Sequence, residues 1–458
     1  MPNNRLIDHN ETQFKKHVVT LAPGVWTAVG FAASTQHMIE GETSVTIIDT
    51  SESTGAATNV LAAFRELTDK PIEKIIYTHS HRDHISGATV FSEGRDVPIL
   101  ASAGFSSDLV GQDETRVAPN KALGRRTMAQ FGIGLSPSER ISLGCGPGDR
   151  PMEGIGAGHI PPNQLISSDQ DIDLDGVKAR LIHAPGETAD HMAVWLPDAK
   201  ILFPGDNWYH AFPNLYAIRG TPYRDFAKWA ETLGNLADLG AEVLAPGHTQ
   251  PVFGADRVRE VLITTRAAIL HVMQHTADGM DAGHSMDDIA ASLTLPDDLA
   301  DKQWLGEFYG KASWSARAFA TGTLGWYDGN PTHLGTLSSV KRAQHMADLT
   351  GGVEALFEQA KQTQDLQWRL ELCDHLIALG APAQGLKADT MVTMAETKLT
   401  LPHATPIFGK QKNSAKEKPH ERHKPDQTPW RQPRFCFHSG HSALRGLRPD
   451  VGIRALGD

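Results

Sequence analysis

The first half of the chain alternates short apolar runs with amphipathic segments. The apolar runs are rich in β-branched and aromatic residues, which is typical of strands. Between them, residues 57–68 and 223–239 carry apolar side chains at helical spacing. The predicted strands are 25–29, 44–49, 74–77, 97–100, 177–183, 192–196, 201–203 and 243–245, with a long surface loop at 144–162. This alternation predicts a layered α/β domain that ends near residue 255.

After residue 255 the pattern is predominantly helical. Helical spacing runs through 257–276, 285–293 and 301–324, and two further segments, 351–378 and 384–398, predict an antiparallel helix pair joined near Gly380. From residue 401 the chain is basic, rich in Pro and His, and has almost no apolar periodicity. We expect this tail to be disordered; attachment to nucleic acid or anionic lipid is the alternative. The predicted organisation is a catalytic domain, a helical domain and a tail, at 1–255, 256–400 and 401–458.

Composition narrows the class of protein. Hydrophobic residues make up 40% of the 458 positions and charged residues 21%, and no apolar run is long enough to span a bilayer. The formal net charge of −11 argues against general nucleic-acid binding, which needs a basic surface. An anionic substrate would therefore need a local cationic site.

The cysteines and the first residues of the chain indicate in which cellular compartment the protein is expected. Cys145, Cys373 and Cys436 lie far apart and show no metal-ligand spacing, so we expect all three to be reduced. The start of the chain is polar and lacks the apolar core of a signal peptide. We therefore expect a cytoplasmic protein, although a leader already removed would leave no trace.

A histidine-rich run follows the predicted strand 74–77, and it reads Thr78-His79-Ser80-His81-Arg82-Asp83-His84. In an extended segment, His79 and His81 point the same way and can reach one cation. Asp83 and His84, where the chain turns toward a helix, offer ligands to a second cation. Such ligands suit Zn²⁺, or less often Mn²⁺ or Fe. A polar loop that merely contains histidines is the alternative, and the completeness of the run argues against it.

Three Pro-Gly turns downstream offer further ligands. Each follows an apolar run and so lies at the carboxyl end of a predicted strand, where ligand-binding residues gather in such sheets. The turns are Ala184-Pro185-Gly186-Glu187-Thr188, Phe203-Pro204-Gly205-Asp206 and Ala245-Pro246-Gly247-His248-Thr249. Any one of them could be an ordinary turn. Together, after the histidine run, they predict Glu187, a bridging Asp206 and His248 as ligands.

These segments resemble the metallo-β-lactamase superfamily, and two longer motifs resemble its alkylsulfatases. The segment that follows the bridging ligand in alkylsulfatases is similar to Asn214-Leu215-Tyr216-Ala217-Ile218-Arg219-Gly220. Their helical dimerisation domain is similar to Leu324-Gly325-Trp326-Tyr327-Asp328-Gly329-Asn330-Pro331. The resemblance covers roughly residues 20–395 and implies an αβ/βα sandwich followed by an all-helical dimerisation domain, and hence a homodimer.

The resemblance also implies a ligand set for two divalent metal ions, expected to be Zn²⁺. One metal would lie on His79, His81 and Glu187, and the other on Asp83, His84 and His248, with Asp206 bridging. Alkylsulfatases usually bridge with glutamate, whereas the wider superfamily has aspartate, as here. The superfamily usually has histidine where this chain has Glu187, which makes His191 a rival for that position. We prefer Glu187 because it lies on the Pro-Gly turn.

Residues after Asp206 are candidates for the substrate. Arg219 is expected to bind sulfate through its guanidinium group, with Asn214 and Tyr209 also assigned to substrate binding. A surface salt bridge is the alternative for Arg219. Catalysis is assigned to Asp83 and to His210 or Tyr216 as general acid, if sulfur is attacked. The aromatic residues that could line a pocket for the alcohol, or simply form core, are Trp208, Tyr209 and Phe212.

The predicted function is hydrolysis of sulfate esters, alkyl and also aryl, by a metal-bound hydroxide at a dinuclear zinc site. Hydrolysis of lactones, thioesters or phosphoesters is the first alternative, favoured by Asp206 and disfavoured by Arg219. A non-enzymatic role as a metal-binding scaffold is a minor second alternative. Alkylsulfatases commonly continue into a lipid-carrier-like domain that shelters the alkyl chain, and the tail here is too short for one, which argues against long-chain detergents.

Overall fold

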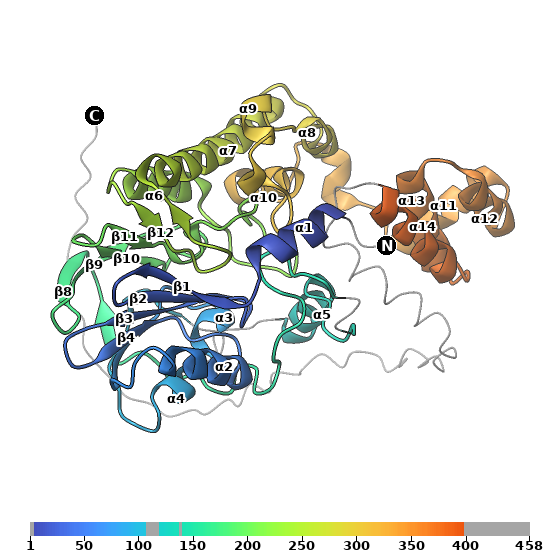
Figure 1. Ribbon diagram of the computed structural model, residues 1–458. Helices are drawn as coiled ribbons and strands as arrows, with labels where there is room; N and C mark the ends of the chain where they lie inside the picture. The colour runs from blue at the N-terminus through green and yellow to red at the C-terminus, as the bar shows by residue number, and fades with distance from the viewer. Residues whose placement is uncertain (1–3, 107–118, 137–139, 398–458) are drawn as a thin grey trace, which may run out of the picture. The chain divides into compact units, whose positions relative to one another are not determined.

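The computed structural model describes residues 4–106, 119–136 and 140–397. Two β-sheets face each other in the first half of the chain (Figure 1). The seven-stranded sheet runs in chain order: β1 (His17–Ala22), β2 (Val25–Val29), β3 (Gln36–Glu40), β4 (Val45–Ile48), β5 (Ile72–Ile76), β6 (Ile99–Ser102) and β7 (Gln164–Ile166). The six-stranded sheet has the order β13 (Val252–Phe253), β12 (Val243–Leu244), β11 (Ile201–Phe203), β10 (Met192–Leu196), β9 (Lys178–His183), β8 (Gln170–Asp173).

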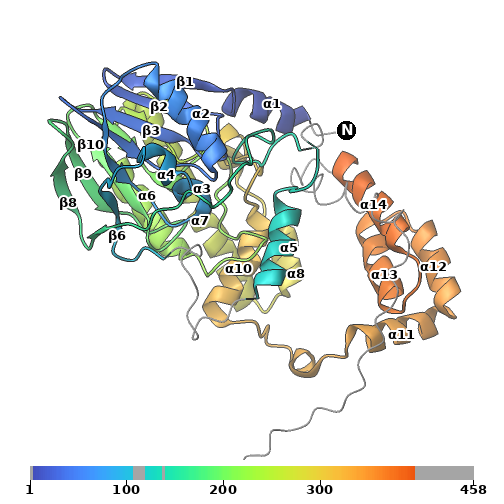
Figure 2. The ribbon, with the colours of Figure 1, turned by 90° about the horizontal axis from the view of Figure 1, so that it is seen from below.

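Strand alternation divides the apolar side chains among three cores. Ile48 and Ile76 point between the sheets and meet Val194 and Phe203 of the other sheet. Their neighbours Ile47 and Ile75 point to the outer face, under α2 (Thr54–Arg65), α3 (Arg82–Ile85) and α4 (Ala88–Phe91), which Figure 2 shows together on that sheet. Central strands that are covered on both faces, such as β10 and β11, are continuous apolar runs, whereas the edge strands β7 and β8 carry exposed polar residues.

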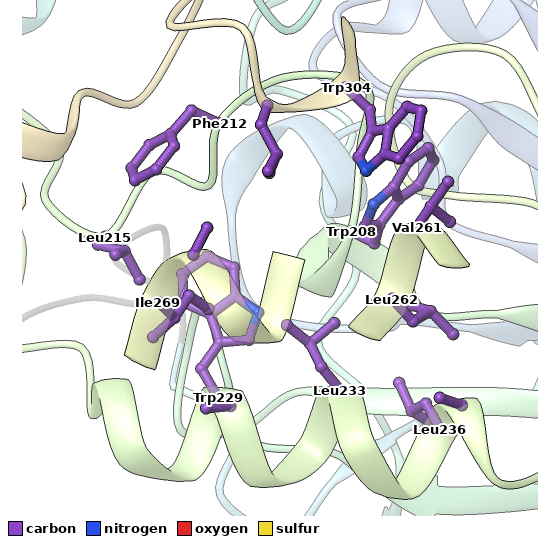
Figure 3. Packing of buried hydrophobic residues seen from close by; sticks show 14 of the residues in the cluster. Trp208, Phe212, Leu215, Trp229, Leu233, Leu236, Val261, Leu262, Ile269 and Trp304 are labelled. Atoms are coloured by element: carbon purple, nitrogen blue, oxygen red, sulfur yellow. The ribbon is translucent and has the colours of Figure 1, made fainter. Parts of the chain in front are cut away.

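The outer face of the second sheet is covered by α6 (Phe226–Ala237) and α7 (Ala255–Asp281). Trp229 and Leu233 of α6 pack against Leu262 and Ile269 of α7, as Figure 3 shows. The predicted αβ/βα sandwich is thus confirmed, and the helical region follows it. The predicted boundary near residue 255 falls between β13 and α7, yet α7 belongs to the outer layer of this sandwich. The proposed division at residues 255 and 400 stays a prediction.

The remaining described helices are α1 (Asn4–Gln13), α5 (Asn120–Gln130), α8 (Met286–Ser292), α9 (Asp297–Ala300), α10 (Ala312–Leu324), α11 (Ser339–Thr350), α12 (Val353–Gln362), α13 (Leu366–Ala378) and α14 (Gln384–Thr397). The prediction of one continuous helix over residues 351–378 was wrong, because the structure has two helices there, α12 and α13. The chain breaks there because the Asp365 side chain accepts the backbone N–H groups of Gln367 and Trp368 and starts α13 anew. Residues 301–311 are also largely irregular, so the predicted helix 301–324 is formed only as α10.

The predictions for the cysteines, the loop 144–162 and membrane-spanning helices can be compared with the described residues. Cys145 and Cys373 are buried and free of disulfides, as predicted, whereas Cys436 and the whole predicted tail 401–458 lie outside the described residues. The predicted loop 144–162 contains no helix or strand. Within the described ranges, none of the helices combines the length and the apolar character needed to cross a membrane.

Candidate metal centre

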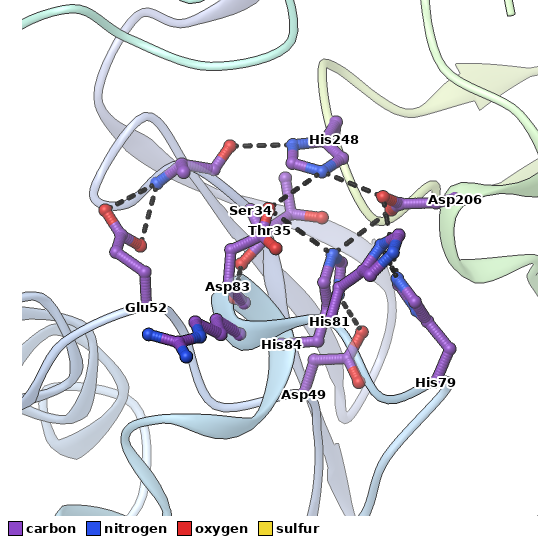
Figure 4. Close-up of polar contacts among 12 residues, drawn as sticks. Ser34, Thr35, Asp49, Glu52, His79, His81, Asp83, His84, Asp206 and His248 are labelled. Atoms are coloured by element: carbon purple, nitrogen blue, oxygen red, sulfur yellow. Dashed lines mark hydrogen bonds and ion pairs between the residues drawn. The ribbon is translucent and has the colours of Figure 1, made fainter. Parts of the chain in front are cut away.

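All seven predicted ligands come from segments that follow the carboxyl ends of strands, with Asp83 and His84 in the short helix α3. The run with His79, His81, Asp83 and His84 follows β5, and the two sheets bring it to the loops after β9, β11 and β12. Figure 4 shows His79, His81, Asp83, His84, Asp206 and His248 converging on one point. Strand direction explains the convergence within the second sheet, because β9 and β11 are both antiparallel to β10 and β12 is parallel to β11, so all three end at the same edge.

The first group of side chains is His79, His81, Glu187 and Asp206, whose ligand atoms lie within 4.8 Å of one another. Glu187 Oε2 is 3.2 Å from His81 Nδ1 and 3.7 Å from His79 Nε2. The two imidazoles approach to 3.0 Å between His79 Nε2 and His81 Nδ1. The predicted pairing of two histidines with Glu187 is therefore present in the structure.

The second group is Asp83, His84 and His248, again within 4.8 Å. Asp83 Oδ2 is 3.4 Å from His248 Nε2 and 3.8 Å from His84 Nε2. The Asp206 carboxylate faces both groups, since its Oδ2 lies 3.1 Å from His248 Nε2 and 3.8 Å from His79 Nε2. Its other oxygen, Oδ1, is 3.3 Å from His84 Nε2. This is the position that a bridging carboxylate requires.

Unpaired atoms show that these residues fit metal ions. His84 Nε2, Glu187 Oε2 and Asp206 Oδ1 are buried and make no well-aligned hydrogen bond, although each faces another candidate ligand at 3.2 or 3.3 Å. Leaving such atoms unpaired is costly, so each needs a ligand. Although burial opposes it, the Asp206 carboxylate raises the pKa of both His84 and His248 well above the usual range. The site thus attracts positive charge, and its imidazole and carboxylate donors suit a divalent transition metal.

Two outer partners orient the second group. Asp49 Oδ2 accepts a hydrogen bond from His84 Nδ1 at 2.7 Å. The Asp49 carboxylate is itself held by hydrogen bonds from the Thr78 backbone N–H and hydroxyl, both at 2.8 Å. His248 Nδ1 lies 2.7 Å from the Ala33 carbonyl oxygen. Both contacts leave the Nε2 atoms of the two rings for the site. Sequence reasoning missed Asp49, although an Asp that ends a buried apolar strand is a signal for it.

Arg224 is a further residue whose role sequence reasoning missed. Its Nη1 lies 2.6 Å from Glu187 Oε1, both side chains are 2% exposed, and it also donates to the Asn214 carbonyl. Burial disfavours the charged guanidinium, yet the Glu187 carboxylate outweighs this and raises the pKa of Arg224. Arg224 therefore occupies one oxygen of Glu187 and leaves the other for the first group.

His191 lies next to the first group without an open ring nitrogen. Its Nδ1 is 2.8 Å from the Thr188 hydroxyl, and its Nε2 accepts the backbone N–H of Asp206 at 3.0 Å. The ring stacks on His79 with centroids 4.0 Å apart. This geometry favours Glu187 over His191 as the ligand, and gives His191 the task of placing the Asp206 loop.

Two Pro-Gly turns need their glycines for space. A Cβ on Gly247 would lie 2.3 Å from Asp206 Oδ1, and one on Gly186 would lie 2.0 Å from Asn207 Oδ1. The Asn207 side chain in turn accepts the Glu187 backbone N–H at 3.1 Å. The turns can bring their ligands together only because they lack a side chain here.

The predicted substrate-binding residues occupy the segment after Asp206. Asn214 Nδ2 and Arg219 Nη1 are both buried without a hydrogen-bond partner. The Tyr209 hydroxyl accepts the Asn214 backbone N–H at 2.7 Å, and its ring packs on Tyr309 with centroids 5.9 Å apart. Two open donors of this kind suit an anion.

The general-acid candidates are placed differently. The His210 ring packs against Trp208 and Trp304, and burial lowers its pKa to about 4, so it is neutral at pH 7. The structure therefore does not bring this ring into the metal groups. Tyr216 is half-buried two residues after Asn214. Trp208 and Phe212 belong to the core under α7 rather than to a pocket (Figure 3).

Comparison with known proteins agrees with the fold. Residues 29–248 match the metallo-β-lactamase superfamily, and residues 285–406 match the alkyl sulfatase dimerisation domain. A linear primary-alkylsulfatase from a Pseudomonas species is 33% identical over 350 residues, which cover 74% of this chain and 66% of that one. An alkyl/aryl-sulfatase from Saccharomyces cerevisiae is 30% identical over 376 residues, with 78% and 57% covered.

A solved structure extends the likeness to three dimensions. The stereoselective inverting sec-alkylsulfatase Pisa1 from Pseudomonas sp. superposes with a TM-score of 0.78 at 26% identity, covering 88% of this chain and 66% of that one. The chain thus spans just under two thirds, or less, of the length of these relatives. With both domains matched in this order, the chain belongs to the metallo-β-lactamase superfamily and is alkylsulfatase-like, with an alkyl sulfatase dimerisation domain after the catalytic fold.

Proposed function

We propose that the protein hydrolyses sulfate esters, alkyl sulfates first and aryl sulfates as a second class. The observation that carries the proposal is the pair of buried open donors, Asn214 Nδ2 and Arg219 Nη1, on the segment that follows Asp206, in a chain that also gathers two groups of metal-ligand type. A charged, planar guanidinium and an amide can together bind the oxygens of a sulfate group. A neutral lactone would leave the Arg219 charge without a partner.

We further propose that two divalent metal ions, expected to be Zn²⁺, complete the site. His79, His81 and Glu187 would hold one, Asp83, His84 and His248 the other, and Asp206 both. Such ions, when bound, supply a hydroxide nucleophile near neutral pH. The chain's own residues then orient the ester: Arg219 and Asn214 hold the sulfate, and Arg224 fixes both Glu187 and the Asn214 backbone.

Of the two general-acid candidates, we favour Tyr216 over His210. The His210 ring lies among tryptophans and is neutral at the pH of the reaction, because burial lowers its pKa to about 4. Tyr216 belongs to the segment that carries Asn214 and Arg219. A proton donor is required only if sulfur is attacked, since sulfate leaves carbon as a stable anion. Hydrolysis in ¹⁸O-water decides this, because label in sulfate means attack on sulfur and label in the alcohol means attack on carbon.

The test of the function is sulfate release from a panel of primary, secondary and aryl sulfates by metal-loaded protein, with and without a chelator. Replacing Arg219 with Ala should lower kcat/KM for sulfates by about 100-fold or more, as loss of one transition-state donor does elsewhere. The matched control is Arg180→Ala on β9, whose side chain is 49% exposed and faces Asp169. Metal-loaded protein that is inactive on all sulfates but hydrolyses lactones or phosphodiesters would refute the proposal.

We also propose a homodimer formed through the matched dimerisation domain. Large apolar side chains are exposed from the end of α10 to the start of α11, including Leu324 at 70%, Trp326 at 71% and Leu334 at 62%. Clusters of this kind on a soluble protein mark contact surfaces. Light scattering at micromolar concentration should give twice the chain mass, and a monomer would contradict the proposal.

A further inference from the structure

A three-residue segment between β2 and β3 contacts both parts of the chain that carry the second group, namely α3 with Asp83 and His84 and the turn with His248. The Ala33 carbonyl accepts His248 Nδ1 at 2.7 Å, and the Ser34 hydroxyl donates to the Asp83 carbonyl. Thr35 donates its backbone N–H to the Gly247 carbonyl at 2.7 Å and its hydroxyl to the Pro246 carbonyl. We call Ala33, Ser34 and Thr35 the clamp segment.

The clamp segment is held by a buried ion pair. Both carboxylate oxygens of Glu52 accept the Ala33 N–H, at 3.0 and 3.1 Å (Figure 4). Arg150 Nε donates to Glu52 Oε1 at 2.6 Å. The side chains of Arg150 and Glu52 are only 6% and 7% exposed. A buried carboxylate that binds one peptide N–H with both oxygens immobilises that peptide plane, here the plane between Ala32 and Ala33. The carbonyl that orients His248 belongs to the next plane, which the Ala33 Cα joins to the first.

The short stretch from Asp49 to Glu52 thus controls both histidines of the second group. Asp49 contacts the His84 ring directly, and Glu52 reaches the His248 ring through Ala33. Among the contacts in the described part of the chain, none joins the clamp segment to His79, His81 or Glu187. The first group depends instead on Arg224 and Thr78.

We propose that Glu52, fixed by Arg150, is a positioning residue for the second metal subsite. It acts through the clamp segment, which sets the tautomer and orientation of His248 and the spacing of the loops that carry Asp83 and His248. The inference rests on the proposed dinuclear centre, and it adds that Glu52 supports the second subsite alone, whereas Asp206 and the Asp49–Thr78 pair contact both groups. A change at Glu52 therefore weakens the second subsite and leaves the first intact.

The test titrates metal-free protein with Co²⁺ and follows binding by calorimetry and by the visible Co²⁺ spectrum. In Glu52→Gln, one of the two binding events should weaken by about 10- to 100-fold, the usual cost of losing an outer partner of a ligand. The other event should keep its affinity and its spectrum. Equal weakening of both events, or no change in folded protein, would overturn the proposal.

Two further variants keep the experiment decisive. Arg150→Lys retains the charge but loses the Nε donor, so it should weaken the same event to a smaller degree even if Glu52→Gln does not fold. Asp175→Asn is the matched control, since this carboxylate also holds a loop, accepting the Thr43 and Ser44 N–H groups at 2.6 and 2.7 Å. Asp175→Asn should leave both events unchanged.

The metal readout separates this inference from the proposed reaction. Wild-type protein that binds only one ion would contradict both the dinuclear centre and the role of Glu52. Normal binding of two ions without sulfatase activity would count against the proposed reaction alone.

Discussion

Removing the positive charge of Arg224 tests how the fold accommodates a carboxylate in the first group. Arg224→Met keeps the length of the side chain but leaves Glu187, 2% exposed, without its 2.6 Å partner. No cation replaces it in the metal-free protein. The variant should therefore be destabilised chiefly by an uncompensated buried charge.

The expected magnitude follows from that charge. Removing one partner of a buried ion pair typically costs about 3–5 kcal/mol, because the remaining charge stays desolvated. In the double variant Arg224→Met, Glu187→Gln no charge is left behind, so the loss should be markedly smaller. Excess Zn²⁺ should reduce the loss in the single variant, since the freed carboxylate would then face a cation.

The assay is urea unfolding at pH 7, with chelator and with excess Zn²⁺. Lys228→Met serves as control, because its ion pair with Glu231 is 58% exposed on both sides and should contribute nothing measurable. A loss below about 1 kcal/mol in metal-free Arg224→Met would refute the reasoning. An equal loss in the double variant would do the same.

Three further predictions concern the turn, the first helix and the dimer. Gly247→Ala places a Cβ 2.3 Å from Asp206 Oδ1 and should abolish tight metal binding in protein that circular dichroism shows to be folded; retained metal content would contradict this. Burial lowers the pKa of His9 to about 4, below its unfolded value, so its contribution is present above about pH 6.5 and is lost as pH falls. At pH 5 this costs about 2 kcal/mol, and urea unfolding of His9→Gln should show a smaller drop in stability between pH 7 and pH 5 than wild type. Trp326→Asp charges an exposed apolar surface and should shift the protein to monomers in light scattering, whereas an intact dimer would exclude Trp326 from the interface.

Local features of the chain were sufficient for the fold class and for naming the candidate ligands that the structure brings together. Central strands such as β10 and β11 are apolar because both of their faces are covered, and this pattern is visible without coordinates. His79, His81, Asp83 and His84 lie within six positions, so backbone geometry alone brings them together. The helix boundaries were less accessible: the break at Asp365 depends on a single capping side chain.

Tertiary structure decided which residues support those ligands. Asp49, Glu52 and Arg224 contact His84, Ala33 and Glu187, which lie 19 to 37 positions away, and only Asp49, at the end of a buried apolar strand, carried a local signal. The preference for Glu187 over His191 as a ligand also depends on the tertiary structure, because both ring nitrogens of His191 form hydrogen bonds, one with Thr188 and one with the Asp206 backbone. The sequence by itself determined what could bind a metal, since ligand type and strand-end placement are local. Only the folded chain decided which atoms remain open, because that depends on every neighbour that packing brings to the site.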